Sequence, residues 1–270
     1  MYINVHSRYS LRYGTMSIEK IVSEAIGHGI TQLALTDVNN STGVMEFFRE
    51  CSDNGLKPIA GIEFRRDKKL LFIGIARNRE GMKELNDFLT YHNLEQLELP
   101  DRAPAFSDAK VIYPFGYLGE LRSNEYLGIH FSQLHELFAI DISSVRAKLV
   151  ALQPVFVADR IEYRLHEYLR GIDLNTLLTM VGPMEKCRPT DSFLKAGEME
   201  ARFAKHSFIL DNTRAMMNDC VMDYPLGRIN LNRRTFTGSK KDDKALLEKL
   251  AMKGMVYRYG NKNKQALAKV

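Results

Sequence analysis

The chain has 270 residues, of which 45% are hydrophobic, and a formal net charge of +5, which suits one large α/β domain with a small extension. No apolar run could span a bilayer and the N-terminus leads directly into a predicted strand, so the sequence argues against membrane and secreted proteins and predicts a cytoplasmic one. Cys51, Cys187 and Cys220 are far apart and lack C-x-x-C spacing, so we expect Cys51, on the apolar face of a predicted helix, to be a buried thiol.

Apolar segments of strand length alternate with amphipathic helical patterns. In the clearest helix, Ser17 is a predicted N-cap and Gly29 a predicted stop. Strands are predicted over residues 2–5, 32–36, 58–63, 70–76, 111–114, 126–130 and 149–153, and helices over 17–29, 42–55 and 79–89. This alternation indicates parallel strands covered by helices. Seven strands favour a distorted β/α barrel over an open doubly wound sheet.

The strand pattern fades after Asp173. We therefore expect a barrel over residues 1–173 and a helical extension with a basic linker over 174–270, with helices at 192–205, 207–220 and 242–259. From Arg228 to the last residue, twelve Lys or Arg accompany three Asp or Glu, so the positive charge belongs to this tail. Both a solvated tail and a phosphate-contacting tail fit this composition, and a free-standing DNA-binding module is one alternative function.

Polar side chains follow three successive predicted strands, and the ends of parallel barrel strands gather at one rim. These residues are His6, Asp37 with Asn39 and Asn40, and Glu63. Together they could form a small metal site. In the alternative, structural interpretation, Asp37 pins the Asn39–Asn40 turn and Glu63 pairs with Arg65 or Arg66. No P-loop or G-x-G-x-x-G motif is present, which argues against nucleotide binding by either of these phosphate-binding loops. The G-x-S-x-G motif of a nucleophile elbow is also absent.

The first strand ends at Asn4-Val5-His6, which has the outline of a metal-binding strand end. A histidine in place of Asn4 and a carboxylate in place of Tyr13, just before the turn glycine Gly14, would complete a cluster suited to Zn²⁺ or Mn²⁺. Only His6 remains of that set.

Four motifs in order carry a family resemblance: HSRYSL at 6–11, LALTDVNN at 33–40, KPIAGIE at 57–63 and IARNREG at 75–81. They resemble the polymerase and histidinol phosphatase (PHP) domain, in the version that opens the alpha subunit of bacterial DNA polymerase III. ALLEKLAMKGMVYRYG at 245–260 is similar to the helix that leads from that domain into the polymerase palm. The resemblance implies a distorted seven-strand β/α barrel, and a chain that is the N-terminal part of a longer polymerase.

Active members of this family hold two or three metal ions at the barrel rim and hydrolyse phosphoesters, in some polymerases as a 3′ to 5′ exonuclease. Of the ligand positions that the resemblance aligns, only His6 and Glu63 keep metal-binding side chains. The eroded positions are Asn4, Tyr13, Val38, Leu71, Pro154 and Phe156. Two ligands cannot close a tight divalent site, so the resemblance implies no tight metal and no catalytic residue here. His166 matches a family histidine on the following helix that is not a metal ligand.

The resemblance therefore predicts a catalytically silent scaffold within a DNA-directed DNA polymerase. Its expected partners are DNA through the intact polymerase, the palm and thumb of the same chain, a proofreading exonuclease subunit and a sliding clamp, with Mg²⁺ in the palm and no cofactor in this fragment. Candidate contacts to DNA or to the polymerase domains are Arg233, Arg234, Lys240 and Lys241. The alternative is a working metal-dependent phosphoesterase or exonuclease that uses His6, Asp37 and Glu63.

Overall fold

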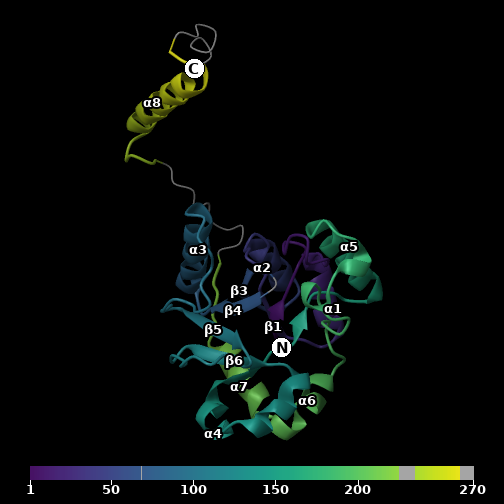
Figure 1. Cartoon of the computed structure of the whole chain (residues 1–270). Helices are drawn as coiled ribbons and strands as arrows, with labels where there is room; N and C mark the ends of the chain where they lie inside the picture. The colour runs from purple at the N-terminus through teal and green to yellow at the C-terminus, as the bar shows by residue number, and fades with distance from the viewer. Residues whose placement is uncertain (68, 225–234, 262–270) are drawn as a thin grey trace. The chain divides into compact units, whose positions relative to one another are not determined.

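Eight strands form one curled sheet that makes an incompletely closed barrel (Figure 1). The computed structural model describes residues 1–67, 69–224 and 235–261. The strands are β1 (Tyr2–Val5), β2 (Gln32–Leu35), β3 (Lys57–Arg66), β4 (Lys69–Ala76), β5 (Ala109–Pro114), β6 (Glu125–Ile129), β7 (Leu149–Ala151) and β8 (Pro154–Val155), in the order β7-β6-β5-β4-β3-β2-β1-β8. The expected α/β barrel class is confirmed.

Two features of the sheet differ from the prediction. First, β4 is antiparallel to both β3 and β5. Only two residues separate β3 from β4 in the sequence, and a connection that short joins antiparallel strands, which accounts for the pairing of β4 with β3. Second, an eighth strand is present, since β8 pairs with β1 through Asn4 and Pro154 and through Val5 and Val155. A two-residue strand leaves no alternation in the sequence by which it could be recognised.

The helices are α1 (Ile18–Gly27), α2 (Val44–Asp53), α3 (Arg79–Leu94), α4 (Ile142–Val145), α5 (Arg160–Asp173), α6 (Glu198–Arg202), α7 (Phe208–Asn218) and α8 (Lys240–Tyr259). Turns of 3₁₀ helix lie at Phe131–Ala139, Arg146–Lys148, Leu178–Met180, Pro183–Glu185 and Ala204–His206. Ser17 caps α1 as predicted, its hydroxyl accepting from the Lys20 amide at 3.2 Å, and Gly29 follows the helix with φ of +69°. Among the described residues, no helix has both the length and the apolar character that a membrane crossing requires.

The predicted helix at 192–205 is wrong for its first half. Residues 192–197 are not helical, and Gly197 has a φ of +76° immediately before the short α6. The Leu194 amide donates to the Tyr2 hydroxyl at 2.8 Å instead of to a helical carbonyl. Tertiary contact with β1 thus replaces the local helical hydrogen bonds.

The chain divides into two units, residues 1–224 and residues 225–270. Residues 174–224, predicted to extend beyond the barrel, lie in the first unit. There, Met216, Met217 and Cys220 at and just beyond the end of α7 join a buried core with Ile3 of β1 and Val150 of β7. Cys51 on α2 is fully buried, as expected. In the second unit, Lys240 and Lys241 are exposed in the first turn of α8, while Arg228, Arg233 and Arg234 lie outside the described residues.

Candidate functional site

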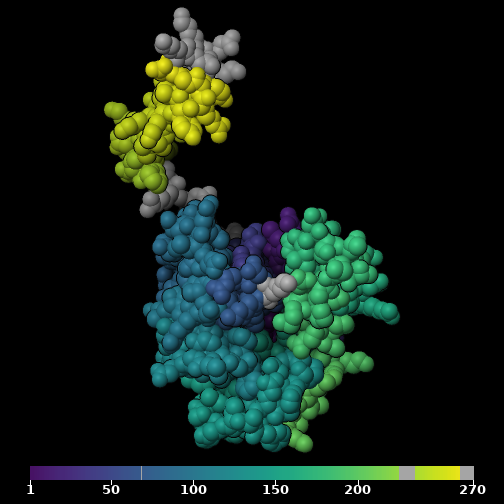
Figure 2. Space-filling model, in the orientation of Figure 1, coloured from purple at the N-terminus to yellow at the C-terminus, as the bar shows by residue number. Residues whose placement is uncertain are grey.

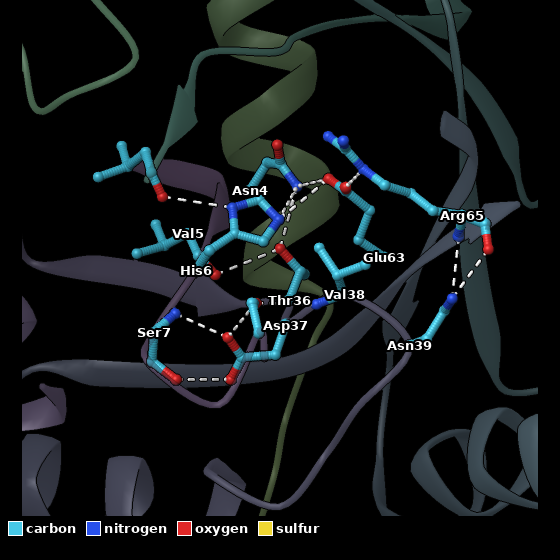
Figure 3. Close-up of polar contacts among 12 residues, drawn as sticks. Asn4, Val5, His6, Ser7, Thr36, Asp37, Val38, Asn39, Glu63 and Arg65 are labelled. Atoms are coloured by element: carbon cyan, nitrogen blue, oxygen red, sulfur yellow. Dashed lines mark hydrogen bonds and ion pairs between the residues drawn. The ribbon is translucent and has the colours of Figure 1, made fainter. Parts of the chain in front are cut away.

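The ends of β1 and β2 and the C-terminal half of β3 bring His6, Asp37 and Glu63 to one rim of the barrel (Figure 3), and all three side chains are buried. His6 Nε2 lies 3.0 Å from Glu63 Oε2, and Asn4 Nδ2 donates to the same oxygen at 2.8 Å. Asn4 also donates to the Thr36 hydroxyl at 3.1 Å. The expected convergence is present. His6, Asn4 and Glu63 are hydrogen-bonded to one another, whereas the Asp37 carboxylate is hydrogen-bonded to Ser7 and Ser10.

Arg65 occupies the remaining side of Glu63. Its Nε donates to Glu63 Oε1 (Figure 3), so both carboxylate oxygens are engaged. Because side chains two residues apart on a strand share a face, the extension of β3 to Arg66 is what directs Arg65 to the rim. The side chain of Asn39 holds this end of β3, donating to the Arg65 carbonyl at 2.8 Å and accepting from the Arg65 amide at 2.9 Å.

The charges at the rim stabilise one another. Burial alone would raise the pKa of the Glu63 carboxyl, but the Arg65 guanidinium, the His6 ring and the hydrogen bonds from His6 and Asn4 outweigh burial and lower this pKa to about 2. Burial would lower the pKa of Arg65, yet Glu63 and Tyr13 raise it. Glu63 and Arg65 are therefore a buried ion pair over the whole physiological pH range.

Aromatic side chains cover this ion pair. The Phe156 ring stacks on the His6 ring with centroids 3.8 Å apart, and Tyr13 packs edge-on against Phe156 at 4.8 Å. The Arg65 guanidinium lies 4.8 Å from the Tyr13 centroid and 5.6 Å from the Phe156 centroid, within the range of cation–π attraction. With Val38 packed against the same cluster, the rim is largely apolar above the polar network.

The side chains at the other two eroded positions also lack atoms that could bind a metal ion. Leu71 is buried on β4, and Pro154 is half-buried on β8 beside Asn4. In the described part of the chain, no three His, Cys, Asp or Glu side chains gather in a way that could hold a metal ion.

Asp37 supports the rim in a different way from the one predicted. Its Oδ1 accepts from the Ser7 amide at 2.7 Å and the Ser10 hydroxyl at 2.7 Å, and its Oδ2 accepts from the Ser7 hydroxyl at 2.8 Å. It therefore fixes the loop after β1, not the Asn39–Asn40 turn. Burial raises the pKa of Asp37, against these hydrogen bonds and the nearby His6.

The loop that Asp37 holds depends on Gly14. A Cβ added at Gly14 would lie 1.8 Å from the Ser7 carbonyl oxygen, so this close approach requires glycine. Our sequence prediction did not single out Ser7 and Ser10. The available signal was two hydroxyl residues spaced three apart between a strand-end histidine and a turn glycine, a pattern suited to loop hydrogen bonds.

We expect Asp37→Asn to lower the free energy of unfolding by about 1–3 kcal/mol. The two oxygens of Asp37 accept three buried hydrogen bonds, and asparagine replaces one of these oxygens with an N–H₂ donor. Urea unfolding at neutral pH measures this loss. Asp53→Asn, at the exposed C-terminal end of α2, is the matched control and should change stability by less than about 0.5 kcal/mol. Equal effects of the two substitutions would contradict a structural role for Asp37.

His166 and His130 are also buried but are held by separate hydrogen bonds. His166 Nδ1 donates to the Tyr13 carbonyl at 2.6 Å, and its Nε2 accepts from the Cys187 amide at 2.9 Å, which defines the neutral tautomer. His130 Nε2 faces Gln153 Oε1 at 2.9 Å, and its Nδ1 accepts from the Ser132 amide at 3.2 Å. Both rings have structural partners.

Comparison with known proteins identifies the family. The PHP domain model matches residues 3–172. DNA polymerase III subunit alpha from Halalkalibacterium halodurans is 26% identical over 96% of this chain and 26% of its own length. The same subunit from Ureaplasma parvum serovar 3 is 28% identical over 58% of this chain and 15% of its own length. The chain thus spans about a quarter or less of these relatives.

Among solved structures, a putative metal-dependent phosphoesterase from Bifidobacterium adolescentis is similar over 34% of this chain and 32% of its own, with a TM-score of 0.29 and 18% identity. That likeness is too slight to add to the family match. The PHP match covers well over half of the chain, and it confirms the family expected from the four motifs. This chain belongs to the PHP domain family.

Proposed function

We propose that this chain is the N-terminal PHP domain of a DNA polymerase of the polymerase III alpha type, and that it serves DNA replication or repair synthesis as a structural scaffold. Its family and the printed names of its relatives support the proposal. The chain spans only a fraction of those relatives, so nucleotide addition, with its Mg²⁺, belongs to palm carboxylates outside these residues. The whole protein is a DNA-directed DNA polymerase under this proposal, and the fragment is not catalytic.

The observation that carries the scaffold role is the buried ion pair of Glu63 and Arg65. A divalent ion needs three or four protein ligands with free lone pairs. His6 Nε2 instead faces Glu63 Oε2, and Arg65 holds the other Glu63 oxygen. These residues therefore do not fit a tight divalent ion. The guanidinium supplies the positive charge that Glu63 needs, and it holds an oxygen that a metal ion would require as a ligand to assist phosphoester hydrolysis.

A scaffold of this kind would brace the palm and thumb and could dock a proofreading exonuclease subunit, with a sliding clamp and DNA as further partners of the intact polymerase in the cytoplasm. We assign the stretch from residue 174 onward to the path towards the palm. Lys240 and Lys241 are exposed and are proposed, with Arg233 and Arg234, to contact DNA or the polymerase domains.

The second candidate is an active metal-dependent phosphoesterase or 3′ to 5′ exonuclease, and the convergence of His6 and Glu63 at the rim favours it. Elemental analysis of the purified chain after incubation with Mn²⁺ or Zn²⁺ separates the two. We expect well below one equivalent of metal, and the same content in His6→Ala. The exposed His135 provides the matched control, His135→Ala. One equivalent of metal that is lost in His6→Ala but kept in His135→Ala would overturn the scaffold proposal.

A further inference from the structure

Helix α5 buries polar side chains and exposes apolar ones. Its inward face carries His166 and Arg170, which are both buried. Its outward face carries four apolar side chains that we call the α5 stripe: Ile161, Leu165, Tyr168 and Ile172, exposed by 81%, 46%, 50% and 69%. A stripe of this spacing on one helix normally faces a core. Helix α5 lies at the outer surface of the first unit (Figure 1), as the space-filling view also shows (Figure 2), so these exposed apolar side chains mark an interaction face.

Fixed contacts hold α5 in this orientation. His166 Nδ1 donates to the Tyr13 carbonyl at 2.6 Å, and Arg170 Nε donates to the Glu185 carbonyl at 2.6 Å. Asp159 caps the helix by accepting from the Ile161 amide at 2.8 Å. If α5 rotated to bury the stripe, the hydrogen bonds donated by His166 and Arg170 would break. The carbonyl groups that accept these bonds would then lose them, which costs free energy. The stripe is therefore a stable feature of the surface.

The two ends of the α5 stripe have complementary shapes. At the N-terminal end, Ile161 is the most exposed of the four side chains. At the C-terminal end, Tyr168 and Ile172 line a hollow of about 670 Å³ together with Leu177 and Met180. Leu177 and Met180 are themselves exposed by 73% and 69%. One chain thus offers a projecting apolar side chain at one end and an apolar hollow at the other.

We propose that the α5 stripe binds the α5 stripe of a second copy of this chain, with the two helices antiparallel about a two-fold axis. The intervals along the stripe are four, three and four residues, and this series is the same in both directions. Antiparallel pairing places Ile161 opposite Ile172 of the second copy, and Leu165 opposite its Tyr168. Each Ile161 then enters the other copy's hollow, which is the self-complementarity that a two-fold interface requires.

The charged groups beside the stripe do not favour an anionic partner in its place. Arg164 pairs with Glu167 at 2.9 Å, and Lys186 pairs with the other Glu167 oxygen at 2.6 Å. Both ion pairs share Glu167, so these charges neutralise one another on one side of the α5 stripe and leave the stripe itself apolar. An apolar surface with a projecting side chain and a hollow favours packing against another helix over binding to a phosphate backbone.

Sedimentation velocity of the 270-residue chain, up to about 100 µM, tests this pairing. We expect a concentration-dependent dimer. Ile161→Glu and Ile172→Lys should each weaken association by about 100-fold, because each inserts a charge opposite an apolar side chain twice per dimer. Leu118→Glu, at a residue 98% exposed between β5 and β6, is the control and should leave the dimer unchanged. A monomeric wild-type chain, or a dimer that both substitutions leave intact, overturns the proposal.

A mixture of the two variants tests the antiparallel register itself. In a heterodimer of Ile161→Glu with Ile172→Lys, the glutamate faces the lysine at one end, and Ile161 faces Ile172 at the other. We therefore expect each variant alone to be monomeric and the mixture to dimerise. Circular dichroism of each variant should match wild type, because the substituted side chains are exposed. If the folded variants fail to associate when mixed, the register is wrong and the proposal falls.

Discussion

Replacing Arg65 with methionine is expected to lower the free energy of unfolding by about 3–5 kcal/mol, the range found when one partner of a buried ion pair is removed. Glu63 is fully buried, and Arg65 pairs with its Oε1 through a full positive charge. Without the guanidinium, this carboxyl must either stay charged in an apolar rim or take up a proton, and both cost free energy. Urea unfolding at pH 7 measures the loss.

Arg66→Met is the matched control for Arg65→Met. Arg66 is the next residue of β3 and pairs with Asp101 at 3.0 Å, but both side chains are considerably exposed. An exposed pair contributes little, so we expect a change below about 1 kcal/mol. Similar losses in the two variants would refute the special role of Arg65.

A double-mutant cycle then separates the ion pair from simple packing. Glu63→Gln alone leaves the largely buried Arg65 cation without its carboxylate, and Arg65→Met alone leaves the buried Glu63 anion without its guanidinium. If the charges depend on each other, the double variant should lose less stability than the two single variants added together. Strict additivity would mean that the loss comes from packing around the aromatic rings and not from the charges.

Acid is expected to destabilise the protein sharply between pH 6.5 and about 4, through His130 and His166. Burial, assisted by Arg188 for His130 and by Arg170 for His166, lowers the pKa of each ring from 6.5 to about 4. The folded protein therefore binds fewer protons than the unfolded chain in this interval. The stability that each neutral ring contributes is fully present above pH 6.5 and is lost as the pH falls to about 4.

The size of this effect is about 3 kcal/mol for each histidine over the full interval, since one pKa unit corresponds to about 1.4 kcal/mol. Urea unfolding at a series of pH values measures the slope. His166→Gln should flatten it, while His135→Gln, at an exposed position, should leave it unchanged. An unchanged slope in both His166→Gln and His130→Gln would contradict the assignment of neutral, buried rings.

Part of the rim could be predicted from the residues alone. His6, Asp37 and Glu63 each follow an apolar strand segment, and parallel strand ends converge whatever the details of the loops. The structure brings all three to one rim, buried. The sequence allows Glu63 to pair with either Arg65 or Arg66, because the two arginines are adjacent and only the strand geometry decides which one shares the face of Glu63.

Other parts of the rim could not be predicted. The sequence of β3 ends in charged residues that are typical of a loop, so the pattern predicts that the strand stops at Glu63, whereas it continues to Arg66. The hairpin with β4 supplies the missing backbone partners, as in the pairing of Arg65 with Leu70. The hydrogen-bond partners of Asp37 lie 27 and 30 residues away, beyond any local pattern.

The amino-acid sequence by itself determined the family, the alternation of strands and helices, and the ends of α1, because motifs, apolar periodicity and capping residues are local properties. Only the tertiary structure decided what fills the rim and which side of α5 is covered. The α5 sequence contains a polar face and an apolar face, and periodicity alone predicts that the apolar one is buried. In the structure, the polar face is turned inward, where His166 donates to the Tyr13 carbonyl, 153 residues away. A buried hydrogen bond between segments so far apart exists only once the chain has folded, so the local pattern of α5 could not predict it.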